Sequence, residues 1–127
     1  MSDLEAIYRR YLAQCNERKF DELGEFLHDQ LQLNGKAISR ASFVDRLRSL
    51  IDAVPDFRWD LIDLVSSGCK LAVRNRTSGT PRAQWLGVEP NGNSVAVTEL
   101  VFYTYKDGKI AEIWVLFDLA AICTQLS

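Results

Sequence analysis

The sequence predicts an α+β fold in which three N-terminal helices pack on a strongly curved, mainly antiparallel β-sheet. Hydrophobic residues recur at helical spacing up to Val54, and from Phe57 onward they alternate with a period of two. Helices that precede an antiparallel meander, instead of separating its strands, are typical of the α+β class. At 127 residues, 47% of them hydrophobic, the chain suits one domain spanning residues 1–127.

Local signals bound the expected elements. Ser2 caps the first helix, a shorter pattern over residues 19–27 predicts the second, Ser39 caps the third and Pro55 ends it. The expected strands cover residues 28–33, 58–65, 70–78, 82–88, 95–105 and 110–117, and residues 119–126 form a short closing helix.

The last two strands form a hairpin around Asp107-Gly108, a dipeptide favoured in two-residue turns. A regular register from this turn places Tyr103 opposite Glu112 and Val101 opposite Trp114, and it sorts the side chains onto two faces. One face is almost wholly apolar and is expected to carry the helices: Thr98, Leu100, Phe102, Thr104, Ala111, Ile113, Val115 and Phe117.

The second hairpin face carries all the carboxylates of the two strands. Its members are Val97, Glu99, Val101, Tyr103, Tyr105, Glu112, Trp114, Leu116 and Asp118. We expect this face to be the outer one, where its apolar side chains would otherwise be wet, and a homodimer would cover them. The alternative is that this face lines a binding site.

Composition excludes several functional classes. The net charge of −2 with mixed signs argues against a nucleic-acid partner. The sequence shows neither a signal peptide nor an apolar stretch long enough to cross a membrane, so a cytoplasmic location is expected. Three scattered cysteines and a single histidine, His28, predict neither a disulfide framework nor a bound metal. The cysteines are interpreted as buried small hydrophobic residues.

Several short strings, taken in order, resemble the SnoaL-like polyketide cyclases of the nuclear transport factor 2-like superfamily. They are Pro55-Asp56, Leu71-Ala72-Val73-Arg74 with Gly79-Thr80, Gly87 with Pro90 and Gly92, Asp107-Gly108-Lys109-Ile110, Glu112-x-Trp114 with Asp118, and Gln125-Leu126. The resemblance covers most of the chain. It implies a cone-shaped fold with a deep pocket between the helices and the concave sheet.

The same resemblance implies chemistry on carbonyl compounds. Polyketide cyclases of this group promote an intramolecular aldol closure with an aspartate as acid/base. The superfamily's ketosteroid isomerases combine a first-helix tyrosine, matched here by Tyr11, with two acids. Their acid positions fall on Asn34 or Gly35 and on Leu100 or Val101, which carry no titrating proton, so an isomerase of that kind is disfavoured.

Glu99 and Asp118 are the candidate proton-transfer groups. Asp118 ranks first because a β-bulge near the strand end would turn it alone toward the concave side, where loss of solvent would raise its pKa. The competing interpretation is that Asp118 only caps the closing helix.

The candidate substrate-binding residues are Tyr11, Arg74, Trp85, Tyr103 and Trp114. Tyr11 and Arg74 would polarise a carbonyl group, and the aromatic side chains would hold a flat ligand. Each has a structural alternative: core or interface filling for the aromatic residues, and pairing with Asp63 or Glu99 for Arg74.

The sequence therefore predicts a protein that binds a small hydrophobic or aromatic ligand. It is either a cofactor-independent cyclase or isomerase that uses acid/base chemistry, or a non-catalytic binding or dimeric scaffold protein with the same fold. A carboxylate inside the cavity would distinguish the two.

Overall fold

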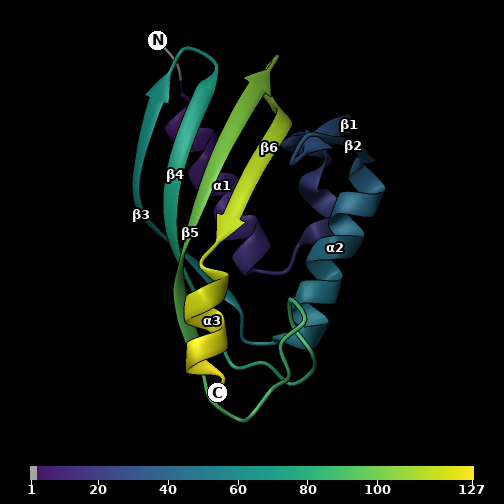
Figure 1. Ribbon diagram of the computed structural model, residues 1–127. Coiled ribbons are helices and arrows are strands. Elements are labelled where there is room, and N and C mark those ends of the chain that lie inside the picture. The colour runs from purple at the N-terminus through teal and green to yellow at the C-terminus, as the bar shows by residue number, and fades with distance from the viewer. Residues whose placement is uncertain (1–2) are drawn as a thin grey trace.

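The computed structural model describes residues 3–127, so Ser2, the predicted cap of the first helix, lies outside the described residues. Three helices and two short strands make up the N-terminal half of the described chain, four long strands follow, and a short helix comes last (Figure 1). They are α1 (Leu4–Asn16), the 3-10 helix η1 (Phe20–Glu25), β1 (Leu27–Leu33), β2 (Lys36–Ser39), α2 (Arg40–Ala53), β3 (Arg58–Ser67), β4 (Lys70–Gly79), β5 (Val95–Lys106), β6 (Lys109–Phe117) and α3 (Leu119–Gln125).

One curved sheet contains all the strands, in the order β2-β1-β6-β5-β4-β3. Every neighbouring pair is antiparallel except β1 with β6, which is parallel. Helices α1 and α2 lie on the concave side of this sheet (Figure 1). The predicted α+β class is therefore confirmed, with β2 as an added strand after the Asn34-Gly35 turn.

The Asp107-Gly108 turn forms as predicted, with Lys106 opposite Lys109 and positive φ at both turn residues. The predicted register beyond the turn is wrong. The structure has a bulge at Ala111: Tyr105 pairs with Ile110, but Thr104 already pairs with Glu112. An extra residue on one strand reverses the facing of every later residue on that strand, because side chains alternate with a period of two.

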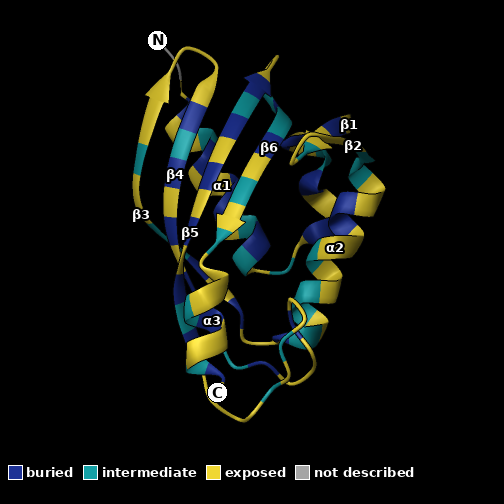
Figure 2. Ribbon diagram, viewed as in Figure 1, coloured by how far each residue is buried: buried dark blue, intermediate teal, exposed yellow. Residues whose placement is uncertain are grey.

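The bulge changes which residues share a face. Tyr103 now lies opposite Ile113 and Phe102 opposite Trp114. The buried face of the hairpin consists of Val97, Glu99, Val101, Tyr103, Tyr105, Ile110, Ile113, Val115 and Phe117, the last two partly exposed. The exposed face carries Leu100, Phe102, Trp114 and Leu116, and the alternation is visible along β5 in Figure 2. The expectation that the Glu99 face is the outer one is therefore wrong.

Residues 82–88 do not form the predicted strand. Leu86 and Gly87 both adopt positive φ, which turns the chain back so that Trp85 forms an isolated bridge with Val88. The amide of Arg82 donates to the carbonyl of Ala53 at the end of α2, at 2.7 Å. This loop carries Trp85 into the interior, where it is buried, instead of placing it in the sheet.

Among residues 3–127, no helix combines the length and the apolar character that crossing a membrane requires.

Candidate functional site

A cavity of about 490 Å³ lies between the helices and the concave sheet. Its walls come from α1, α2, the end of β1, the first residues of β3, the inner residues of β5 and β6, and the loop at residues 84–86. Most lining side chains are aliphatic or aromatic, and its volume falls in the range of small-molecule pockets.

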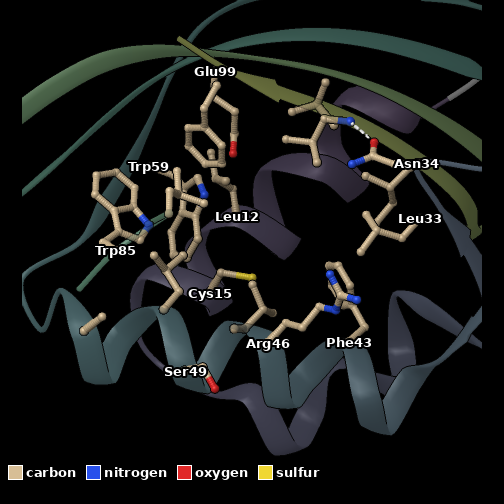
Figure 3. A pocket seen from close by; sticks show the side chains of 18 of the residues that line it. Leu12, Cys15, Leu33, Asn34, Phe43, Arg46, Ser49, Trp59, Trp85 and Glu99 are labelled. Carbon is tan, nitrogen blue, oxygen red and sulfur yellow. Dashed lines mark hydrogen bonds between the residues drawn. The ribbon is translucent and has the colours of Figure 1, made fainter. Parts of the chain in front are cut away.

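Glu99 is the only carboxylate among the described residues that line this cavity. It lies on the inner face of β5, directly opposite Asn75 on β4, and is 5% exposed. Figure 3 shows its side chain extending from the sheet into the cavity. A buried carboxylate must be hydrogen-bonded or protonated, because its charged form loses the stabilisation of water.

Asn75 connects Glu99 to helix α1. Its Nδ2 donates to Glu99 Oε1 at 3.0 Å and to the hydroxyl oxygen of Tyr8 at 2.8 Å. Both Asn75 and Tyr8 are buried, at 1% and 0% exposure. The network fixes the Glu99 side chain between strand and helix, so its carboxyl group cannot move out to solvent without breaking buried hydrogen bonds.

Burial raises the pKa of Glu99 to about 7, while hydrogen bonds from Asn75 and Trp59 act in the opposite direction and limit the rise. A carboxyl group with this pKa exchanges protons readily near neutral pH, which is the property required of a general acid or base. Burial also raises the pKa of Tyr11 and Tyr103, so both phenols remain protonated hydrogen-bond donors.

Aromatic side chains form one end of the cavity. The amide of Asn16 holds Trp59 by bonding both its backbone N–H and its carbonyl, at 3.0 and 2.8 Å. The ring of Trp85 packs edge-on against Phe57 and Phe117, with centroids 5.8 and 6.1 Å apart. Rings fixed in this way present a rigid surface to a flat ligand.

Four of the predicted site residues line the cavity: Tyr11, Trp85, Glu99 and Tyr103. The other three lie outside its lining. Arg74 is on the outer face of β4, where its guanidinium donates to both carboxylate oxygens of Asp63 at 3.0 and 2.9 Å. This is one of the two pairings that the sequence left open.

Trp114 is placed outside because the Ala111 bulge turns it to the exposed face. There its indole N–H donates to Glu112 at 3.1 Å. Asp118 is exposed and accepts a hydrogen bond from the amide of Ala121 at 3.0 Å, the geometry of a helix cap. The competing interpretation of Asp118 therefore matches its contacts.

Sequence reasoning missed Asn75, Trp59 and Arg46. A signal existed for Asn75, because it alternates with Leu71, Val73 and Thr77 on one face of a strand and is the most polar of that set. Its pairing with Glu99 follows only from the β4–β5 register, which the sequence does not fix.

The described residues contain no group of three or more His, Cys, Asp or Glu side chains arranged to hold a metal ion. Cys15 lines the cavity, and burial raises the pKa of its thiol to about 12, so it carries no thiolate near neutral pH. Cys69 and Cys123 are exposed, which corrects the prediction that all three cysteines are buried.

A comparison with family models matches residues 5–126 to the SnoaL-like polyketide cyclases. The chain belongs to this family. Among solved structures, a SnoaL-like polyketide cyclase from Agrobacterium tumefaciens is 35% identical, with 100% of each chain covered and a TM-score of 0.94. The search of curated proteins found no match.

Two more distant structures show the fold alone. TsrD from Streptomyces laurentii is 24% identical, with 100% of this chain and 98% of that chain covered and a TM-score of 0.90. IdmH from Streptomyces antibioticus is 20% identical, with 98% and 99% covered and a TM-score of 0.87.

The raised pKa of Glu99 predicts how stability depends on pH. Below about pH 4.5 the Glu99 carboxyl is protonated in both the folded and the unfolded chain, so its titration does not change the free energy of unfolding. Between that pH and about 7 only the unfolded chain ionises, so the free energy of unfolding falls, by about 3 kcal/mol in total. Glu99→Gln lacks this proton, so we expect it to gain about that amount relative to wild type between pH 4.5 and pH 8.

Urea unfolding of both proteins at pH 4.5 and pH 8 measures the difference. Titration of all other groups cancels between the two proteins. Glu22→Gln, a change at an exposed position, is the matched control and should show no pH-dependent difference. A constant difference between Glu99→Gln and wild type would show that Glu99 has an ordinary pKa.

Proposed function

We propose that this protein binds a small, mainly apolar or aromatic carbonyl compound in its cavity and that Glu99 transfers protons on it. The observation that carries the proposal is a single buried carboxylate, with a pKa of about 7, in a chamber lined mainly by apolar and aromatic side chains. Such a group has no evident structural use that an apolar residue would not serve better, because burying it is costly.

The chemistry that fits is proton abstraction next to a carbonyl group. The ionised form of Glu99 takes a proton from the α-carbon, and the electron pair left behind forms an enolate. A phenol of Tyr11 or Tyr103 donates a hydrogen bond to the enolate oxygen. In a cyclisation, the enolate carbon attacks a second carbonyl carbon of the same molecule, and Glu99 returns its proton to the new alkoxide. No step in this sequence draws on a cofactor.

The relatives support this class of reaction. The 35% identical structure from Agrobacterium tumefaciens is described as a SnoaL-like polyketide cyclase. The residues proposed here differ from the sequence-based prediction, because Glu99 takes the role first given to Asp118 and because Arg74 and Trp114 lie outside the cavity lining. The alternative function, a non-catalytic ligand-binding protein, uses the same cavity and needs no proton transfer.

Hydrogen–deuterium exchange on a probe ketone tests the proposal without knowledge of the natural substrate. We expect the protein to accelerate α-proton exchange of 2-tetralone, a flat bicyclic ketone, in D2O as followed by NMR. The rate should rise with pH through about 7, as Glu99 becomes the ionised base. Glu99→Gln should lower the protein-dependent rate by about 10²–10⁴-fold.

Asp118→Asn separates the two candidate carboxylates. It retains the helix cap, because Asn caps about as well as Asp. Unchanged exchange in this variant, with loss in Glu99→Gln, supports Glu99, whereas the reverse pattern restores Asp118. Binding of 2-tetralone to the wild-type protein can be followed by quenching of tryptophan fluorescence. If 2-tetralone binds but its α-proton exchange stays at the rate seen in buffer alone, the non-catalytic alternative holds.

We also propose that the exposed face of the sheet pairs with a second copy of the chain. Phe102 and Leu116 are 64% and 73% exposed and lie beside Leu100 and Trp114 on neighbouring strands. This patch differs from the one predicted from the regular register. Of the apolar residues in that predicted patch, only Trp114 and Leu116 lie on the exposed face. The pairs Asp63–Arg74 and Lys70–Glu112 bring both charge signs to the same face, which suits contact between two identical surfaces.

Light scattering at micromolar concentration tests the pairing. We expect twice the chain mass for wild type and a single-chain mass for Phe102→Glu, because a charge at the centre of an apolar interface loses solvent without gaining a partner. Leu119→Glu, at a position 49% exposed on α3, is the control and should remain a dimer. A single-chain mass for wild type would contradict the proposal.

A further inference from the structure

The described lining of the cavity carries one cation, Arg46. It lies on α2, across the cavity from Glu99 on the sheet, as Figure 3 shows. Leu12, Trp59 and other apolar side chains line the walls between these two polar groups. The chamber therefore has a carboxyl group on one wall, a guanidinium group on the opposite wall and mainly apolar side chains between them.

Arg46 differs from the neighbouring arginines in having no hydrogen bond or ion pair within residues 3–127. Arg40 bonds Asp29 at 2.8 Å and the carbonyl of Leu27 at 3.1 Å. Arg48 pairs with Asp21 and Asp45. The protein thus neutralises these two guanidinium groups internally and leaves the guanidinium at the cavity without an anion.

The position of Arg46 follows from helix geometry. Phe43 and Leu50 lie three residues before it and four after it, so all share one face of α2, and all line the cavity. Arg48 is two positions further along and projects from a different face, toward η1, where Asp21 lies. Both arginines are exposed. They differ in what they face, so Arg48 is a matched control for Arg46.

We propose that Arg46 binds a carboxylate on the ligand, so that the substrates of this protein are carbonyl compounds with an apolar body and an acidic group at the end remote from Glu99. This inference rests on the proposed function, because it assumes that the cavity is the ligand site. A guanidinium presents two parallel N–H donors that match the two oxygens of a carboxylate. One unpaired guanidinium matches a singly charged acid group.

Binding of two probes that differ only in charge tests the assignment. The probes are 2-naphthylacetic acid and 2-naphthylacetamide, and calorimetry at pH 7.5 gives both dissociation constants. We expect wild type to bind the acid about 10-fold more tightly than the amide. Arg46→Gln should remove that preference while leaving the affinity for the amide unchanged. Arg46→Lys should retain part of it, because the charge remains and the paired donors are lost.

Arg48→Gln is the control, and it should keep the full preference for the acid. The charge of Glu99 changes the affinity for the acid probe equally in every variant. This contribution therefore cancels when the acid-over-amide preferences of the variants are compared. An acid preference that persists in Arg46→Gln, or none in wild type, overturns this inference and leaves the cavity as a ligand site. Failure of both probes to bind wild type at millimolar concentration overturns the inference and the proposed function together.

Discussion

One extra residue in β6, Ala111, determines which side chains enter the cavity. In a sheet, a single inserted residue reverses the facing of the rest of its strand relative to its partner. Here the bulge brings Ile113, Val115 and Phe117 onto the same side as Glu99 and Tyr103. Without it, the apolar face of β6 and the cavity face of β5 would point in opposite directions, and no single layer of helices could cover both.

The resulting cavity holds one carboxyl group, Glu99, whose charged form is disfavoured because it is buried away from water. The sheet supplies an amide directly opposite Glu99, through the pairing of Asn75, and α1 supplies Tyr8 behind that amide. These groups stabilise the ionised form only in part, so the pKa stays near 7 and does not return to that of an exposed carboxylate. Burying Glu99 lowers the stability of the fold. Such a loss is typical of functional sites, where a carboxyl group with a raised pKa is needed for the chemistry.

The sequence was sufficient for the class of fold. The change from helical to alternating periodicity at Phe57 predicted the element order, and the Asp107-Gly108 turn predicted its own geometry. The faces of the hairpin were not predictable by alternation alone, because Ala111 carries no local signal for a bulge. The loop that delivers Trp85 was missed for a similar reason, since positive φ at Leu86 is not evident from a leucine.

The central claim is that Glu99 holds a titrating proton near neutral pH inside the cavity. The most direct measurement is the ¹³C chemical shift of its carboxyl carbon as a function of pH, in protein labelled at glutamate side chains and assigned with Glu99→Gln. We predict a midpoint near pH 7, well separated from the exposed glutamates. A midpoint near pH 4.5 would contradict the account, because Glu99 would then be an ordinary, fully ionised carboxylate with no special capacity for proton transfer.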